Sequence, residues 1–284
     1  MYVFETPRPI LATVELAAGT VRVSAGDHPR TTVQVLPGDR SALRDVATAA
    51  AAEVEYADRR LTVAVPETDA ARRGAVTVDI RLPAGSGLHG DALAADFHAT
   101  GRLAECRIGT VCGHLVLART GPLHLSTLLG NVTVDRIDGD VTAVAAAGDV
   151  RIGHLDGAAR FTRTRGSTRL GEITGGLRLT AESGDLHIGR AHGAVEARTG
   201  NGDLRVDEAV RGPLTLESGC GDVDVGVTGG AAAHLDLDSR GGTVYRALGL
   251  LDGAGPPPDR GTVRVRARTV LGDIVARSAT ANPP

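Results

Sequence analysis

Gly148-Asp149-Val150-Arg151-Ile152 is one copy of the motif that decides the fold of this chain. The motif reads glycine, a small polar residue, an apolar residue, any residue, an apolar residue. It returns at one constant interval, at Gly166, Gly184 and Gly202, and once more at Gly221 after one inserted residue. A second series lies halfway between these copies, so the unit has nine residues and two units make one period. The glycines of the second series are Gly121, Gly139, Gly157, Gly175, Gly193 and Gly212.

A nine-residue unit holds one strand of about five residues and a tight turn, and it buries an apolar face only by stacking on other units. Strand alternation puts the third and fifth positions inward. The first series supplies Val132, Val150, Thr168, Leu186 and Leu204, with Val134, Ile152, Leu170, Ile188 and Val206. The second supplies Leu123, Val141, Ala159, Leu177 and Val195, with Leu125, Ala143, Phe161, Leu179 and Ala197. The sequence therefore predicts an all-β fold, a β-solenoid (β-helix) with about 18 residues per coil, whose cross-section is either two-sided or a rounded triangle.

Four segments follow along the chain. Residues 1–85 alternate like strands without the repeat, and one helix is predicted from Ser41 to Ala52 with Ser41 as its N-cap. Because a solenoid end exposes an unpaired strand edge, we expect residues 1–85 to form an N-terminal β-rich cap. Residues 86–249 hold the solenoid repeats, and Cys106–Gly113 matches Val150–Gly157 as the start of the first regular coil. Residues 250–277 are predicted to form a C-terminal loop and closing strands, and residues 278–284 a disordered tail.

The repeated units resemble a known family. Ser183-Gly184-Asp185-Leu186-His187-Ile188, the lead-in Leu82-Pro83-Ala84-Gly85 and the closing Gly272-Asp273-Ile274 are similar to the bacterial "putative adhesin" β-strand-repeat proteins, a domain of unknown function. The resemblance covers most of the chain. It implies a fold, and since the family has no established catalytic residues, it implies no catalytic site.

Composition limits the possible partners. Of the 284 residues 42% are hydrophobic but only 2% aromatic, which suits thin coils filled by valine, leucine, isoleucine and alanine. The net charge of −3 gives no global field that would recruit nucleic acid or an anionic membrane. The start of the sequence lacks a basic and apolar targeting segment, and no apolar run is long enough to span a bilayer, so a cytoplasmic location is predicted. We expect Cys106, Cys112 and Cys220 to be free thiols.

Outward positions form ladders, because equivalent residues of adjacent coils lie one strand spacing apart. Five arginines in two such columns are the candidate ligand-binding residues: Arg151, Arg169 and Arg205 on one face, and Arg160 and Arg178 on the other. They could bind a repeating anion such as an acidic polysaccharide. The structural alternative is that a neighbouring column neutralises the first set: Asn131, Asp149, Ser167, Asp185 and Asp203. The seventh position also alternates partly in sign, as a solubilising ladder would: Arg136, His154, Glu172, Arg190 and Glu208.

Other chemistry is disfavoured. The Gly-Asp turns invite comparison with calcium-binding nonapeptide repeats, but they lack paired glycines, so turn capping by aspartate is favoured. No cofactor or metal is expected, because the histidines fall in different columns or non-adjacent coils. Three pairs of aspartates are two residues apart, which places both carboxylates on one face of a strand at a separation near that of the two catalytic carboxylates of a retaining glycosidase. These pairs are Asp138/Asp140, Asp222/Asp224 and Asp236/Asp238. A sugar cleft also needs exposed aromatic side chains. The repeat sequence from Gly121 to Val225 contains only one aromatic residue, Phe161, which is predicted to point inward, so no catalytic residue is assigned.

Two functions remain open. The first is a non-catalytic scaffold or binding module that acts through its long faces or by self-association, with a protein, a further copy or an anionic polymer as partner. The alternative is a β-helical enzyme acting on an acidic carbohydrate or a small biosynthetic substrate. A concave pocket that joins a carboxylate and an arginine of strongly shifted pKa would favour the enzyme, and alternating surface charges would favour the scaffold.

Overall fold

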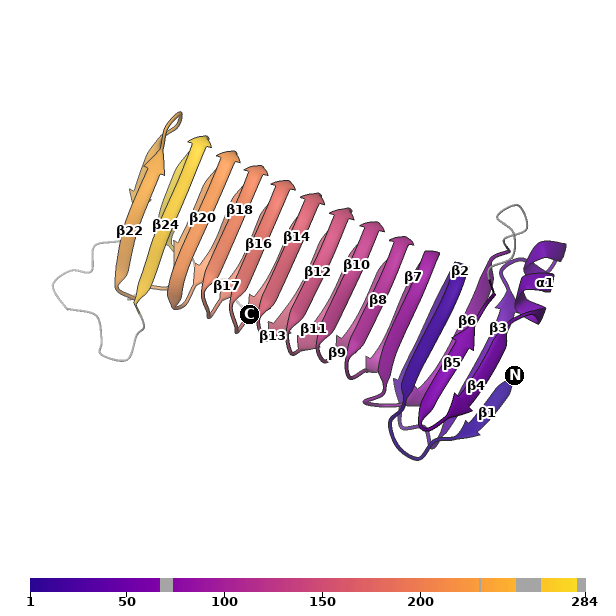
Figure 1. The fold of residues 1–284 in the computed structure, drawn as a ribbon. Helices are drawn as coiled ribbons and strands as arrows, with labels where there is room; N and C mark the ends of the chain where they lie inside the picture. Colours follow the sequence, from indigo (N-terminus) through magenta and orange to yellow (C-terminus); the bar gives the residue numbers. More distant parts are fainter. Residues whose placement is uncertain (67–73, 230, 249–261, 280–284) are drawn as a thin grey trace. The chain divides into compact units, whose positions relative to one another are not determined.

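The computed structural model describes residues 1–66, 74–229, 231–248 and 262–279. Within them the chain is all-β apart from one helix, and it divides into two compact units (Figure 1). The N-terminal unit comprises Met1–Gly139 with Ala143–Ala145, and the C-terminal unit comprises Asp140–Thr142 with Ala146–Pro284. Residues 249–261, which contain the predicted C-terminal loop, and residues 280–284 of the predicted tail lie outside the described residues. Ser278, the first residue of the predicted tail, is the last residue of a strand. No helix in the described ranges is long and apolar enough to cross a bilayer.

The C-terminal unit is built from coils of two strands each. One strand of each coil joins the odd-strand face: β13 (Val150–Asp156), β15 (Thr168–Ile173), β17 (Leu186–Ala191), β19 (Leu204–Ala209) and β21 (Val223–Val227). The other joins the even-strand face: β14 (Ala159–Arg165), β16 (Leu177–Ser183), β18 (Val195–Asn201) and β20 (Gly212–Cys220). Neighbours within a face are parallel, with Val150 beside Thr168 and Thr168 beside Leu186. Because these partners are separated by the period of the sequence repeat, the predicted β-solenoid is confirmed, and its coils are two-sided.

The N-terminal unit has coils of the same kind with a shorter step. These coils include β7 (Gly87–Arg102), β8 (Cys106–Cys112), β9 (Leu115–Thr120), β10 (Leu123–Leu129) and β11 (Val132–Asp138). Cys106 lies beside Leu123, and Leu115 lies beside Val132, so the step in both cases is one residue shorter than the step from Val150 to Thr168. The predicted match of Cys106–Gly113 to Val150–Gly157 is therefore wrong, because Cys106 is in register with the second series. Strand β12 (Val141–Ala147) contributes residues to both units.

The inward columns predicted from the repeat are confirmed, since every residue in them is buried. A further buried column was not predicted: Leu155, Ile173, Ala191 and Ala209, all fully buried. These residues occupy the eighth position of the unit. The sixth and seventh residues of the unit both point outward. A strict alternation of inward and outward residues would therefore place the eighth residue outward, and it does not predict this column.

A glycine at each turn lets the coils approach closely. Gly202 has a φ of 145° and Gly184 a φ of 135°, a backbone conformation that residues with a side chain avoid. A Cβ atom on Gly202 would collide with the carbonyl oxygen of Gly184 in the preceding coil. The repeated glycines are therefore required by the stacking of the coils.

Arg163 occupies an inward position that holds a small residue in the neighbouring coils. In register with it, on the next strands along the face, lie Ala181, Thr199 and Ser218. The Thr199 hydroxyl donates a hydrogen bond to the carbonyl of the turn glycine Gly184 at 3.3 Å, and the Arg163 guanidinium donates to Gly148 in the same way. Arg163 is only 3% exposed, its Nε has no hydrogen-bond partner, and no carboxylate of the described residues lies within 4 Å. Burial accordingly lowers the pKa of Arg163.

Residues near the N-terminus add further parallel strands to the stack, and beyond these the strand pairing becomes antiparallel. Strand β2 (Leu11–Gly26) runs parallel to β7 along its length, so coil pairing begins well before the predicted boundary at residue 86. Strands β5 (Arg60–Ala64) and β6 (Val76–Pro83) pair in parallel with β2. Three strands then pair in antiparallel fashion: β3 (Arg30–Pro37) with β6, β1 (Tyr2–Glu5) with β3, and β4 (Glu53–Ala57) with β5.

Helix α1 spans Leu43–Ala50 and is shorter than predicted. The prediction of Ser41 as its N-cap is wrong: the N-cap is Ala42, which makes no side-chain hydrogen bond. The Ser41 hydroxyl donates to the Asp39 carboxylate at 2.6 Å instead. The helix is anchored by Asp45, whose carboxylate accepts hydrogen bonds from the backbone amides of Asp39 at 2.9 Å and Ala75 at 3.1 Å.

The last strands of the sequence are not the last strands of the stack. Strand β24 (Val263–Leu271) lies between β20 and β22 (Ala233–Ser239) (Figure 1). On the opposite face, β25 (Ile274–Ser278) lies between β21 and β23 (Val244–Ala247). The closing strands predicted within residues 250–277 thus form the penultimate coil. Periodicity cannot reveal this order, because Leu235 and Val265 fit the same inward column equally well.

We expect Ile152→Asp to unfold the C-terminal unit. Ile152 is 3% exposed, and an unpaired carboxylate at this position costs several kcal/mol. The control is Arg151→Asp, which places the same charge one residue away on the outward side of the strand. Circular dichroism and thermal melting should show loss of folding for Ile152→Asp alone; equal melting temperatures would contradict the register described here.

We expect Arg163→Thr to stabilise the protein by about 1 kcal/mol. Threonine can donate to the Gly148 carbonyl as Thr199 donates to Gly184, and the change removes a buried cation and its unsatisfied Nε. Arg163→Ala is the comparison, since it removes the cation but leaves the carbonyl without this donor. Urea denaturation should rank threonine above alanine, and a lower midpoint for threonine than for arginine would show that the guanidinium is stabilising.

Candidate binding surface

The five candidate arginines lie on two faces of the C-terminal unit. Arg151 and Arg169 are side by side on β13 and β15, and His187 on β17 separates them from Arg205 on β19. On the even-strand face, Arg160 on β14 lies directly beside Arg178 on β16. All five side chains are exposed. The structure thus brings together two pairs of neighbouring arginines, and Arg205 stands apart from the first pair.

The candidate arginines differ in their partners. Arg151 contacts the Asp149 carboxylate at 3.3 Å, and Arg205 contacts Asp207 at 2.7 Å. Arg178 donates two hydrogen bonds, at 3.0 and 2.6 Å, to one oxygen of Glu196 on the next strand. Arg169 and Arg160 have no ion-pair partner within 4 Å among the carboxylates that the structure describes. Each neighbouring pair therefore contains one arginine held by the protein and one that is not.

The aspartates that follow the turn glycines cap the turns. The Asp185 carboxylate accepts a hydrogen bond from the backbone amide of Asp203 at 3.0 Å, and Asp203 accepts one from the amide of Asp222 at 2.8 Å. Asp222 repeats the contact with the amide of Asp273 at 2.7 Å. Across the described ranges, no group of three or more histidine, cysteine, aspartate or glutamate residues could hold a metal ion. The interpretation of the Gly-Asp units as turn caps accounts for these contacts.

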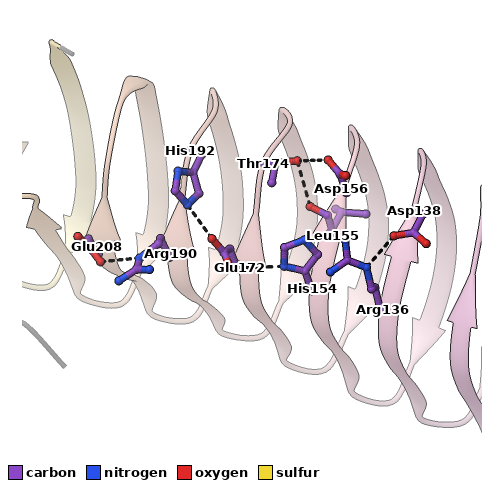
Figure 2. Close-up of polar contacts among 10 residues, drawn as sticks. All are labelled: Arg136, Asp138, His154, Leu155, Asp156, Glu172, Thr174, Arg190, His192 and Glu208. Carbon is purple, nitrogen blue, oxygen red and sulfur yellow. Dashed lines mark hydrogen bonds and ion pairs between the residues drawn. The ribbon is translucent and has the colours of Figure 1, made fainter. Parts of the chain in front are cut away.

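The seventh position forms a ladder of opposite charges on the odd-strand face, shown in Figure 2. The Glu172 carboxylate lies 3.4 Å from Nδ1 of His154 on one side and 2.8 Å from Nε2 of His192 on the other. Arg190 contacts Glu208 at 2.7 Å. The partly alternating ladder expected from the sequence is present in these contacts.

Sequence reasoning missed the histidine–carboxylate contacts that run diagonally between coils. His192 meets Glu172, and His187 meets Asp207 at 2.7 Å, and in each case the partners are 20 residues apart. A diagonal step of one coil plus two residues connects outward positions of adjacent strands. Searching the sequence at that spacing would have found both pairs.

These contacts keep the outer carboxylates ionised. The hydrogen bond with His192, helped by the charges of His154 and Arg190, lowers the pKa of Glu172. For Asp207, burial raises the pKa, but hydrogen bonds from His187 and Arg205 outweigh it and the pKa is lowered. Asp138, between Arg119 at 2.6 Å and Arg136 at 2.7 Å, also has a lowered pKa. A general acid needs the opposite shift.

Three hollows of the C-terminal unit adjoin these side chains. One of about 450 Å³ on the even-strand face is lined by Arg160, Arg178 and Glu196. A smaller one of about 210 Å³ is lined by Arg169, His187 and Arg205. The third, of about 570 Å³, combines Arg190, Arg205 and Arg277 with four carboxylates, Glu172, Asp207, Glu208 and Asp224.

The cysteines are free, as predicted. Cys106 is buried, and burial raises the pKa of its thiol to about 11. A thiol with so high a pKa is not a nucleophile at neutral pH.

The fold and its outer ladders define a class, that of two-sided β-solenoids with capped Gly-Asp turns. Within that class, the chain belongs to the Toastrack DUF4097 family, whose sequence profile matches residues 13–248. The resemblance predicted from the Gly-Asp units is thereby confirmed at the level of a domain of unknown function.

Several solved structures are similar to this chain. A "putative adhesin" from Bacteroides fragilis NCTC 9343 is 14% identical, with a TM-score of 0.37 over 97% of this chain and 95% of the other. A "putative adhesin" from Parabacteroides distasonis ATCC 8503 is also 14% identical, with a TM-score of 0.37 over 96% and 95%. A "putative lipid binding protein" from the same organism is 11% identical, with a TM-score of 0.34 over 97% and 95%. No curated protein matches.

We expect Glu172→Gln to reduce the acid sensitivity of the fold. A carboxyl group whose pKa is lowered by folding contributes stability above its ordinary value of 4.5, and this contribution is lost as the pH falls through the lower, folded value. The contribution at neutral pH should be at most about 1 kcal/mol, because the pair is partly exposed. Urea midpoints at about pH 7 and pH 3 should differ less for Glu172→Gln than for wild type. The control Glu182→Gln changes an exposed carboxylate that has no ion-pair partner within 4 Å in the described structure, and it should leave the difference unchanged.

Proposed function

We propose that this chain is a non-catalytic binding scaffold whose two faces present neighbouring arginines to an anionic partner. The observation that carries the proposal is that Arg169 and Arg160 each lie beside another arginine and have no carboxylate within 4 Å in the described structure. Like charges on adjacent strands repel each other, so these contacts do not stabilise the sheet. Their guanidinium groups offer free donors that match carboxylate, sulfate or phosphate oxygens.

The spacing of these donors supports a repeating ligand. Adjacent strands lie about 4.8 Å apart, so two arginines in register hold their charges at a fixed separation. A polymer with several anionic groups gains affinity when a second group binds next to the first. The hollow of about 450 Å³ beside Arg160 and Arg178 adds a concave surface on the even-strand face. An acidic polysaccharide, a phosphate polymer or an acidic protein surface fits these requirements.

A second candidate function is an enzyme acting on an acidic carbohydrate or a small biosynthetic substrate. The mixed-charge hollow of about 570 Å³ favours it, because three arginines could bind an anionic substrate beside carboxylates. Against it, the pKa values of Glu172 and Asp207 in that hollow are both lowered, so neither carboxylate holds a proton for general acid catalysis. The binding scaffold is therefore the function that we propose.

We expect Arg151→Ala/Arg169→Ala and Arg160→Ala/Arg178→Ala to weaken binding of a heparin-like polymer at least about fivefold each, since each removes two ionic contacts. Wild-type affinity should fall about threefold for each doubling of the salt concentration, because bound groups exchange with counterions. Isothermal titration calorimetry at low salt measures both effects.

The control is Arg40→Ala/Arg44→Ala, which removes the same charge from exposed positions outside the coils. Loss of binding in the control to the same extent would show that only net charge matters. Equally weak binding by wild type and both coil variants would overturn the proposal.

A further inference from the structure

Strand β22 is an edge strand of the C-terminal unit. Among the described strands it pairs only with β24, and it is seven residues long. The other strands with a single partner in the described ranges are shorter: β1 and β23 have four residues each, and β4 has five. A long edge strand presents a row of backbone donors and acceptors to another chain.

The apolar column of the solenoid is only partly covered at this edge. Leu235 and Leu237 are in register with Val265 and Ala267 of β24. Val265 is 1% exposed and Ala267 is fully buried, whereas both leucines are partly exposed. One more strand beside β22 would complete their burial.

The hydrogen-bond pattern shows which backbone groups face outward from the edge. The carbonyl oxygen of Ala232 accepts a hydrogen bond from the amide of Val263 at 2.9 Å, and the amide of Arg240 donates one to the carbonyl oxygen of Thr269 at 3.2 Å. Residues alternate in direction along a strand of a ladder, so the even-numbered residues of β22 bond to β24. The amides and carbonyls of Leu235 and Leu237, together with those of Ala233 and Ser239, therefore point away from β24.

We propose that β22 pairs with β22 of a second copy of this chain in antiparallel fashion, about a two-fold axis at Asp236. This register pairs all seven residues and places odd-numbered residues opposite each other, as the backbone groups that point away from β24 require. Leu235 then lies opposite Leu237 of the second copy, which covers both partly exposed side chains. The occupant is a second copy because the strand is complementary to itself.

The outward charges of β22 fit the same register. His234 lies opposite Asp238 of the second copy, on both sides of the axis, and forms an opposite-charge pair when protonated. The two Asp236 carboxylates face each other at the axis. Each lies near Arg266 and Arg268 of its own chain, at 3.6 and 3.5 Å, which offsets their repulsion.

A two-fold contact of this kind occupies the β22 edge of both copies, so no β22 edge remains for a third copy. Each copy contributes the same surface, so the product is a dimer and does not grow into a filament. This interface is separate from the arginine pairs, and a dimer would double the number of binding faces available to one polymer.

Sedimentation velocity on the full chain at concentrations from about 1 to 100 µM tests the interface. Wild type should be dimeric at the upper end. Leu235→Pro removes a donor that faces the open edge, a change that edge strands tolerate, and it should raise the dimer dissociation constant at least about tenfold. Circular dichroism must show that the variant is folded.

A charge exchange tests the register without relying on proline. His234→Asp and Asp238→His should each weaken the dimer, because each places two like side chains opposite each other, and the double variant should restore it. A monomeric wild type would overturn the proposal. So would a dimer that neither Leu235→Pro nor the single charge variants weaken, because its contact would then lie elsewhere.

Discussion

The structure depends on the close contact between the turn glycine of one coil and the backbone of the coil before it. Gly202, with its φ of 145°, lets the chain turn where any Cβ atom would meet the Gly184 carbonyl. Where an aspartate follows the glycine, its carboxylate accepts an amide hydrogen from the next coil, as Asp185 does from Asp203. Each Gly-Asp unit therefore both permits the approach and satisfies a backbone donor that the turn would leave unpaired. The parallel strands follow at the spacing that these turns set.

Once the turns fix the register, the electrostatics of the faces is determined as well. Outward residues meet partners one coil away, or one coil plus two residues away, which is how Arg178 reaches Glu196 and His187 reaches Asp207. Opposite charges at these steps hold the carboxylates ionised and strengthen the sheet slightly. Like charges at the same steps weaken it, and Arg151 beside Arg169 is such a case. The faces thus contain some contacts that stabilise the coils and some that do not.

The sequence predicts those features that repeat at one fixed spacing. The inward columns through Val150 and Ile152 could be located because strand alternation and the constant period of the glycines act together. The register of Cys106 could not, since the step there is one residue shorter and both series begin with the same apolar pattern. The position of β24 between β20 and β22 could not be predicted either, because the inward residues of equivalent strands are interchangeable. Arg163 was missed for another reason: its burial depends on its reaching the Gly148 carbonyl, which no hydropathy pattern encodes.

Inward and outward positions consequently differ in how well the fold tolerates their substitution. A charge at Ile152 costs several kcal/mol, while a change at Arg151 alters an exposed contact worth about 1 kcal/mol or less. The outward residues can therefore change chemistry without loss of the fold, and what they bind is set by side chains that the stacking does not use. Arg169 and Arg160 meet this description, because neither has a carboxylate within 4 Å in the described structure and each lies beside a second arginine. Their positive charge exceeds what the coils require, and this excess is the reason why we propose an anionic ligand.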